Sequence, residues 1–343
     1  MPSSSHGRAC LSMVLVAAMA LCAGLLSGCG SGIAPITVYI PALATEDLVG
    51  PCQYDLLLPQ PKASEYAGKP VTGVLVIYER GDSNLLYQDQ TLRDAAFALR
   101  LGILWAHQCN ARSTGDLQAD AGQGPGRSLF AALTQLGAKS RHPELASIGL
   151  ELYGFSAAGV LTATMENDYP ERVLGAMLYA AGSASTDLDD VQIAPAAARV
   201  PTLVLANALD IDSGTYRSRM YFHRGRALAG MWSFAVQSGT DHCCNLSTRS
   251  IIVPWMQAIA PNLPAGMASA PRPADSSGIV AAIPNSSFVC TPNGIVDAQG
   301  DTDCNFTAAS LGPPGSAKED TGWLPDQASG EAWLAWVTHS GTN

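Results

Sequence analysis

Continuous apolar runs, rather than a strict alternation of apolar and polar residues, dominate the middle of the chain. Strands that are buried on both faces have this pattern, because neither of their faces meets water. The runs therefore predict the strands of a covered sheet. They occupy residues 54–59, 71–78, 103–108, 148–153, 172–181, 201–207 and 232–237.

Segments with helical character separate most of these predicted strands. They lie at residues 88–101, 128–136, 143–147, 160–171 and 250–260. Strand and helix in regular alternation connect parallel strands by crossovers, which place helices on both faces of the sheet. The pattern predicts an α/β fold with a mainly parallel, doubly wound sheet over residues 54–260.

The first residues read as a targeting signal. Arg8 is followed by an apolar stretch at 11–26, and Leu26-Ser27-Gly28-Cys29 comes directly after it. This tetrapeptide resembles the lipobox of bacterial lipoproteins, in which the cysteine becomes the lipidated first residue. We expect a signal peptide at 1–28 and a lipid on Cys29, which would anchor an exported protein to a membrane. Gly30 and Ser31 favour the outer membrane in a Gram-negative host, and an ordinary secretory signal is the alternative.

Composition limits the partners. Of the 343 residues, 47% are hydrophobic and 14% are charged, and the net charge is −10. Such a chain can bury a large core, and the absence of a basic cluster argues against nucleic acid as a partner.

The flanks of the predicted sheet differ from it in composition. Residues 29–53 are rich in Pro and Ala and are expected to form a tether. Residues 261–343 are rich in Pro, Gly and Ser and are expected to form an irregular extension. The extension is expected to end in a short helix, near 330–338, that docks through Trp333 and Trp336.

Six cysteines remain after the signal and the Cys29 acceptor are set aside. They are Cys52, Cys109, Cys243, Cys244, Cys290 and Cys304. An even number in an exported chain predicts up to three disulfides, and their pairing stays open. Cys290–Cys304 is the easiest pair to form, and Cys52–Cys109 is a second candidate. No Cys-x-x-Cys spacing indicates zinc, so no metal site is predicted.

An acidic loop at 297–303 lies between Cys290 and Cys304. Its carboxylates are the oxygen ligands that calcium prefers, but the distal glutamate of a helix-loop-helix site is missing. A solvated, disulfide-closed loop is the favoured interpretation.

The stretch 152–159, Leu-Tyr-Gly-Phe-Ser-Ala-Ala-Gly, joins an apolar run to a helical segment. Small residues on both sides of Ser156 allow a sharp strand-to-helix turn, which lifts the hydroxyl above the end of the strand. The N–H of Ala157 would open the helix and face a developing anion. Ser156 is therefore a candidate nucleophile.

A serine nucleophile needs a histidine base and an acid that orients it. Asp210 follows the strand at 201–207, and His242 follows the strand at 232–237. Loops after parallel strands meet at one edge of the sheet, so these residues can converge on Ser156. Asp212 is a rival acid, and Asp241 is expected to shape the histidine loop. His107, His142, His223 and His339 are assigned to packing or to the surface.

Residues 54–260 resemble the α/β-hydrolase superfamily, whose members carry nucleophile, acid and histidine in this order. The resemblance implies a triad of Ser156, Asp210 and His242, with Asp210 at the family's usual spacing. It also implies an oxyanion hole made by Ala157 and a backbone N–H of Gly81 or Asp82. Two features depart from the family. In the strand-to-helix turn around Ser156, called the elbow, Ala158 replaces the second glycine of the usual Gly-x-Ser-x-Gly. After the early strand, Arg80-Gly81 replaces the usual His-Gly.

We therefore expect an exported serine hydrolase, related to esterases, lipases and polyester depolymerases, that cleaves carboxylic esters without a cofactor. The short connection between residues 181 and 201 leaves no room for a large lid, which is compatible with polymeric as well as small esters. A non-catalytic surface lipoprotein that uses the fold for binding, and an acyltransferase with the same triad, are the alternatives. The sequence leaves the substrate and the oligomeric state open.

Overall fold

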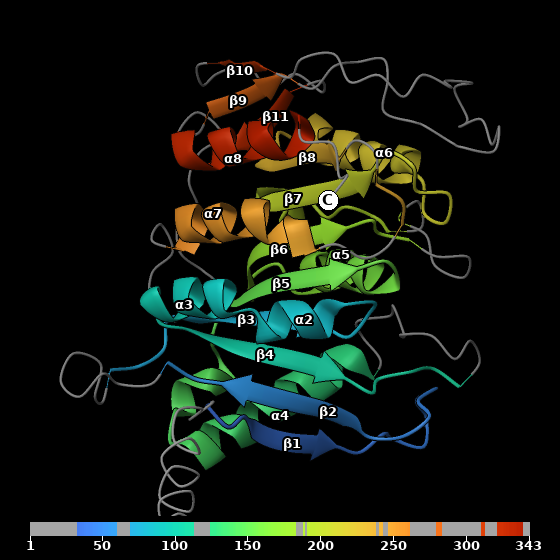
Figure 1. Cartoon of the computed structure of the whole chain (residues 1–343). Coiled ribbons are helices and arrows are strands. Elements are labelled where there is room, and N and C mark those ends of the chain that lie inside the picture. Colours follow the sequence, from blue (N-terminus) through green and yellow to red (C-terminus); the bar gives the residue numbers. More distant parts are fainter. Residues whose placement is uncertain are drawn as a thin grey trace, which may run out of the picture. The chain divides into compact units, whose positions relative to one another are not determined.

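The apolar runs of the sequence form one eight-stranded sheet (Figure 1). Its strands are β1 (Ile36–Ile40), β2 (Cys52–Leu57), β3 (Gly73–Tyr78), β4 (Leu101–His107), β5 (Leu150–Phe155), β6 (Val173–Tyr179), β7 (Thr202–Asn207) and β8 (Trp232–Gln237). The computed structural model describes residues 33–59, 69–112, 124–182, 188, 191–237, 240–242, 246–260, 279–282, 310–312 and 321–338.

The strand order is β1-β2-β4-β3-β5-β6-β7-β8, and the strands from β4 to β8 in this order are parallel. Only β2 runs against its neighbours, pairing antiparallel with both β1 and β4. The carboxyl ends of the parallel strands therefore lie along one edge, where the loops that leave them meet. The prediction of a mainly parallel sheet is confirmed.

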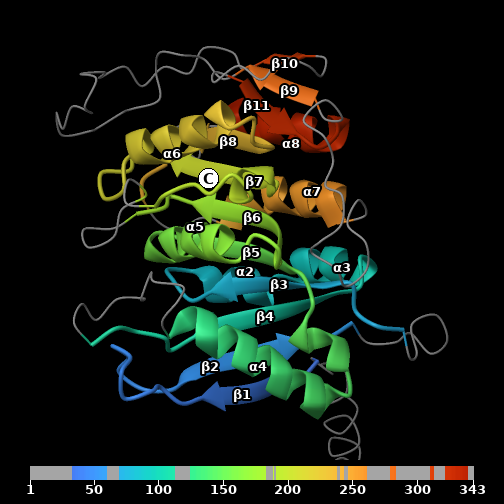
Figure 2. The same cartoon turned by 180° about the vertical axis from the view of Figure 1, so that it is seen from behind.

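Helices cover both faces of this sheet, as predicted. Figure 1 looks onto the face that carries α2, α3, α7 and α8, and Figure 2 shows α4, α5 and α6 on the opposite face. Their bounds are α2 (Ser83–Gln88), α3 (Gln90–Ala98), α4 (Pro125–Ser140), α5 (Ala157–Asp168), α6 (Thr215–Ala227), α7 (Arg249–Ile259) and α8 (Gln327–Thr338). Short 3₁₀ turns lie at Pro143–Ala146, Ala197–Arg199 and Leu246–Thr248. The sequence pattern did not predict α6.

The central strands are buried along their whole length. Every residue of β3, β5, β6, β7 and β8 is buried. A strand with helices on both faces meets no water on either side, which explains why these runs are continuously apolar.

The antiparallel edge of the sheet contains a disulfide and an additional strand. Cys52, at the start of β2, is bonded to Cys109, just after β4, so one of the two favoured pairings is confirmed. β1 lies within residues 29–53, the segment expected to form a tether, and pairs with β2 through the register Val38↔Tyr54. The sheet thus begins before the expected boundary at Tyr54.

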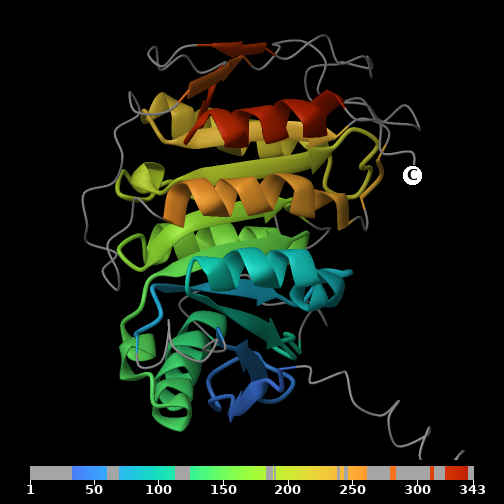
Figure 3. The ribbon, with the colours of Figure 1, turned by 60° about the vertical axis from the view of Figure 1, so that its left-hand side comes forward.

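The described parts of residues 261–343 include three short strands and a helix. β9 (Ile279–Ala282), β10 (Ser310–Gly312) and β11 (Thr321–Leu324) form a separate antiparallel sheet. Helix α8 lies against β8 (Figure 3), where the indole N–H of Trp333 donates to the carbonyl of Phe234 at 2.8 Å. Trp333 and Trp336 are both buried. The proposed pair Cys290–Cys304 and the acidic loop 297–303 lie outside the described residues.

One acid is buried in the middle of the sheet. The side chain of Glu151, on β5, is fully buried, and neither carboxyl oxygen has a hydrogen-bond partner among the described residues. Burial raises the pKa of this carboxyl from 4.5 to about 8. An isolated buried charge is far more costly than a neutral acid, so the folded protein keeps Glu151 protonated near neutral pH.

The buried acid predicts a loss of stability with rising pH. The unfolded chain releases the Glu151 proton above its ordinary pKa, whereas the folded chain holds it until about pH 8. The contribution of this group to the free energy of unfolding is fully present below pH 4.5. It then falls by about 1.4 kcal/mol per pH unit until the folded pKa is reached. Glu151→Gln does not titrate and should remove this slope. Between pH 5 and pH 8, its free energy of unfolding should therefore rise by a few kcal/mol relative to that of wild type.

Urea unfolding of wild type and Glu151→Gln at pH 5 and at pH 8 measures this change in the free energy of unfolding. The exposed Glu171 provides a matched control, because Glu171→Gln should keep the wild-type slope. Equal slopes for wild type and Glu151→Gln would contradict the assignment.

Candidate active site

The turn between β5 and α5 is strained at its apex. Ser156 has φ 56° and ψ −127°, a conformation that non-glycine residues rarely adopt. The neighbouring strand β6 holds the turn, because the N–H of Ser156 donates to the carbonyl of Tyr179 at 2.9 Å. The Ser156 carbonyl accepts from the N–H of Gly159 at 2.8 Å and of Gly182 at 3.2 Å. The main chain therefore fixes the serine on both sides.

Small residues at this turn are required by contact. A Cβ atom on Gly154 would collide with the carbonyl of Ala158 and with Thr162, which lie on the first turns of α5. A Cβ on Gly159 would lie 2.6 Å from the Cβ of Ala181, after β6. Helix α5 can therefore approach β5 and β6 closely only because these positions are glycine.

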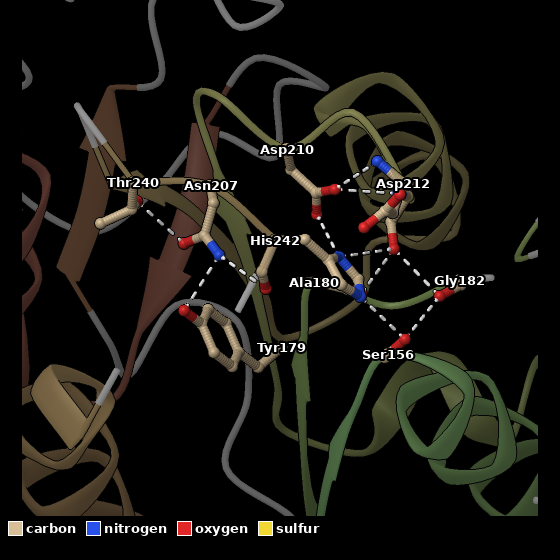
Figure 4. Close-up of polar contacts among 10 residues, drawn as sticks. Ser156, Tyr179, Ala180, Gly182, Asn207, Asp210, Asp212, Thr240 and His242 are labelled. Atoms are coloured by element: carbon tan, nitrogen blue, oxygen red, sulfur yellow. Dashed lines mark hydrogen bonds and ion pairs between the residues drawn. The ribbon is translucent and has the colours of Figure 1, made fainter. Parts of the chain in front are cut away.

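Three side chains from separate loops form a continuous chain of hydrogen bonds (Figure 4). The distance between Ser156 Oγ and His242 Nε2 is 3.0 Å, and that between His242 Nδ1 and Asp210 Oδ2 is 2.9 Å. Ser156 and Asp210 are buried, while the His242 ring keeps 16% of its side-chain surface exposed. Ser156, His242 and Asp210 thus lie next to one another in this order, at distances that allow proton transfer.

The loop after β7 orients the acid. The N–H groups of Asp212 and Ser213 both donate to Asp210 Oδ1, each at 2.9 Å. This leaves Oδ2 of Asp210 facing the imidazole. Asp212 is exposed and contributes its N–H to this arrangement, so of the two candidate acids it is Asp210 whose carboxylate lies at the imidazole.

A polar scaffold beneath the histidine was not recognised in the sequence. The Asn207 amide donates to the Tyr179 hydroxyl at 2.9 Å and to the carbonyl of His242 at 3.4 Å. Its oxygen accepts from Thr240 Oγ1 at 3.1 Å. The sequence does carry a signal for it: an asparagine ends the apolar run 201–207, where an unpaired amide would be costly to bury.

Backbone N–H groups near Ser156 are available to an anion. Ala157 is the first residue of α5, and Gly81 and Asp82 form the turn after β3. Among the described residues, neither the Ala157 N–H nor the Gly81 N–H has a hydrogen-bond acceptor, whereas the Asp82 N–H bonds its own carboxylate. Gly81 has φ 54°, and the Arg80 N–H donates to Ser83 Oγ at 2.9 Å, which fixes the turn. The second N–H donor stays open between Gly81 and Asp82.

Asp82 is a further acid on this edge of the sheet. Its side chain is half-buried and makes no capping bond to α2. Burial raises the pKa of Asp82, and its charge acts on the hydroxyls of Tyr153 and Tyr179. Burial is also the main cause that raises the pKa of these two tyrosines, which remain neutral at physiological pH.

The other histidines of the described chain have partners of their own. His107 bonds Asp55 at 3.0 Å and stacks on Trp105, and His142 bonds Glu144 at 2.8 Å. His223 accepts from Arg219 at 3.2 Å, and His339 lies outside the described residues. In the described ranges, no group of three or more His, Cys, Asp or Glu residues is arranged to hold a metal ion.

Comparison with known proteins finds similarity in structure alone. No protein-family model matches the sequence, and no curated protein matches it. An acylaminoacyl peptidase from Pyrococcus horikoshii superposes with a TM-score of 0.49 at 9% identity, covering 69% of this chain and 43% of the peptidase. An S-formylglutathione hydrolase from Staphylococcus aureus has a TM-score of 0.42 at 12% identity, covering 66% of this chain and 100% of the hydrolase. A poly(3-hydroxybutyrate) depolymerase from Bordetella parapertussis has a TM-score of 0.38 at 16% identity, covering 67% of this chain and 88% of the depolymerase.

The class of fold follows from the chain itself. A mainly parallel eight-stranded sheet is covered by helices on both faces, and a strained serine stands between β5 and α5. An aspartate follows β7 and a histidine follows β8. This is an α/β-hydrolase-type fold.

The close approach at the elbow predicts the effect of a single methyl group. Gly154→Ala places a Cβ against the backbone carbonyl of Ala158, which cannot move without unwinding the start of α5. We expect the free energy of unfolding to fall by at least about 3 kcal/mol, as for severe overpacking. Chemical denaturation measures it.

Gly50→Ala is the control, because a Cβ at Gly50 meets no atom within 4 Å. Equal stability of Gly154→Ala and Gly50→Ala would show that the elbow tolerates the contact.

Proposed function

We propose that this protein is a serine hydrolase that cleaves carboxylic esters. The proposal rests on the chain of hydrogen bonds from Ser156 Oγ through His242 to Asp210. A serine hydroxyl is a weak nucleophile, and a base within 3.0 Å that is itself oriented by a buried carboxylate is the arrangement that activates it.

In the proposed reaction, Ser156 Oγ attacks the ester carbonyl while His242 Nε2 takes its proton. Asp210 holds the imidazole and stabilises its charged form, and the N–H groups of Ala157 and Gly81 face the oxyanion. His242 then gives the proton to the leaving alcohol, so an acyl group remains on Ser156. Water, activated by the same histidine, releases the acid and restores the serine. The reaction uses only groups of the chain.

The proposed substrates are small and polymeric esters, such as polyhydroxyalkanoate or plant-wall esters. The connection between β6 and β7 spans only 180–201 and contains the short turn Ala197–Arg199. Such a connection is too short for a large lid domain, and an open site admits bulky chains.

Ser156→Ala tests the nucleophile. We expect labelling by a fluorophosphonate probe to disappear and the hydrolysis of p-nitrophenyl esters to fall by at least about 10⁴-fold, as for loss of a triad serine. The control is Ser250→Ala, because Ser250 is exposed on α7 and bonds only the nearby carbonyl of Ser247.

The outcomes separate the alternatives. Hydrolysis retained by Ser156→Ala would refute the nucleophile assignment. A wild-type protein that neither labels nor hydrolyses any ester would favour a non-catalytic binding lipoprotein. Product formed mainly with an added alcohol, rather than with water, would favour an acyltransferase.

We also propose that the protein is exported and anchored through a lipid on Cys29, with the outer membrane as the favoured location. The support is the apolar stretch at 11–26 followed by Leu-Ser-Gly-Cys. Both features lie outside the described residues. Within the described part, no helix is long and apolar enough to span a bilayer.

Cys29→Ala tests the anchor. It should abolish incorporation of labelled palmitate and shift the protein from the membrane fraction to the soluble exported fraction or to an uncleaved precursor. Cys22→Ala, within the apolar stretch, is the matched control and should be lipidated normally. Palmitate on Cys29→Ala would contradict the proposed site.

A further inference from the structure

A second serine lies against the triad. Ser213, in the loop between β7 and α6, is buried, and its hydroxyl oxygen lies 3.3 Å from His242 Nδ1. The same oxygen lies 2.9 Å from the carbonyl of Ala180 and 2.9 Å from the carbonyl of Gly182. Nothing in the sequence pattern indicated this residue.

The protons at Ser213 can be placed from its neighbours. Both carbonyls are acceptors only, so the single hydroxyl proton of Ser213 points to one of them. A lone pair of Oγ then faces His242 Nδ1. That nitrogen carries the proton shared with Asp210 Oδ2, so Ser213 Oγ is a second, longer acceptor for the Nδ1–H.

The backbone after β6 is shaped to make these contacts. Ala180 has φ 45° and Gly182 has φ 133°, and both values are unfavourable for residues with a side chain. A Cβ on Gly182 would lie 3.4 Å from the Cβ of Ser213, so this glycine packs directly on the serine. The strained turn directs two carbonyls at one hydroxyl group.

Gly182 also links the second serine to the nucleophile. Ser156 Oγ lies 3.0 Å from the Gly182 carbonyl and 3.0 Å from His242 Nε2, and its single proton can point to only one of them. Only the bond to Nε2 prepares the serine for attack. When the Ser213 proton points to Gly182 rather than to Ala180, this carbonyl becomes a poorer acceptor for Ser156.

We propose that Ser213 is a positioning residue of the active site. It holds His242 through the Nδ1 edge of the ring and supports the charged imidazole with a second acceptor. When its own proton points to Gly182, it also biases the Ser156 proton toward Nε2. The backbone N–H of Ser213 donates to Asp210 Oδ1 at 2.9 Å, so one residue fixes both the acid and the base. This inference rests on the proposed function of the same site.

Ser213→Ala keeps the backbone bond to Asp210 and removes only the hydroxyl. We expect kcat for p-nitrophenyl esters to fall about tenfold, the effect of losing one hydrogen bond, with KM changed less than about twofold. Ser213→Thr retains the hydroxyl and should recover most of the lost kcat. Ser218→Ala is the matched control, because Ser218 is a buried serine of α6 whose hydroxyl has no partner among the described residues.

A second measurement does not require activity. In a Ser156→Ala background, the Nδ1 proton of His242 gives a downfield NMR resonance whose exchange with water reports how well the ring is held. Replacing Ser213 by Ala should shift this resonance and speed its exchange several-fold, and Ser218→Ala should do neither. If Ser213→Ala does not fold, Ser213→Cys, whose thiol is a weaker acceptor, takes its place and should give the same direction of change.

The results separate the two proposals. An unchanged resonance, exchange rate and kcat in folded Ser213→Ala would refute the role of Ser213. A loss of kcat that Ser213→Thr does not recover, with an unchanged resonance, would also refute it by showing a packing effect. If wild type hydrolyses no ester and does not label, the proposed function fails, and the NMR comparison still decides whether Ser213 positions His242.

Discussion

The strained backbone of Ser156 is the constraint on which the rest of the site depends. A residue in such a conformation costs of the order of 1–3 kcal/mol and persists only where its surroundings fix it. Here the surroundings are the carbonyl of Tyr179, the N–H of Gly182 and the close packing of α5 against β5. The strain raises the hydroxyl above the sheet and opens α5 with an N–H, that of Ala157, which has no acceptor in the part of the chain that the structure describes. Both features are needed by a nucleophile with an oxyanion site.

The rest of the site is built from neighbouring strand ends rather than from one segment. β6 supplies the turn with Ala180 and Gly182, β7 supplies the loop with Asp210, and β8 leads to His242. Each loop bonds to another, so the position of each of these side chains depends on the others. Parallel strands make this possible, because all their carboxyl ends lie on one edge.

Strand β5, which leads to Ser156, also contains a destabilising residue away from the site. Glu151, the second residue of β5, has no partner for its carboxyl oxygens among the described residues, although a buried polar group without a hydrogen bond is unfavourable. It is tolerated because burial keeps the carboxyl neutral. By contrast, the buried amide of Asn207 is satisfied by Tyr179 and Thr240, and it contributes to the support of His242. Two buried polar residues of the same sheet thus have opposite consequences.

The amino-acid sequence predicted the buried strands, the sharp turn at Ser156 and the positions of Asp210 and His242 after later strands, because continuous apolarity and small residues are local properties. It did not indicate β1, a short strand with an exposed Tyr39, or α6, whose polar residues lack a helical apolar stripe. The packing of the loops shows that the carboxylate of Asp210, rather than that of Asp212, lies at His242, and that Ser213 lies beside the same ring. The direction of a carboxylate, and the neighbours of a hydroxyl, are set by how loops from different strands pack together, which no local pattern of residues records.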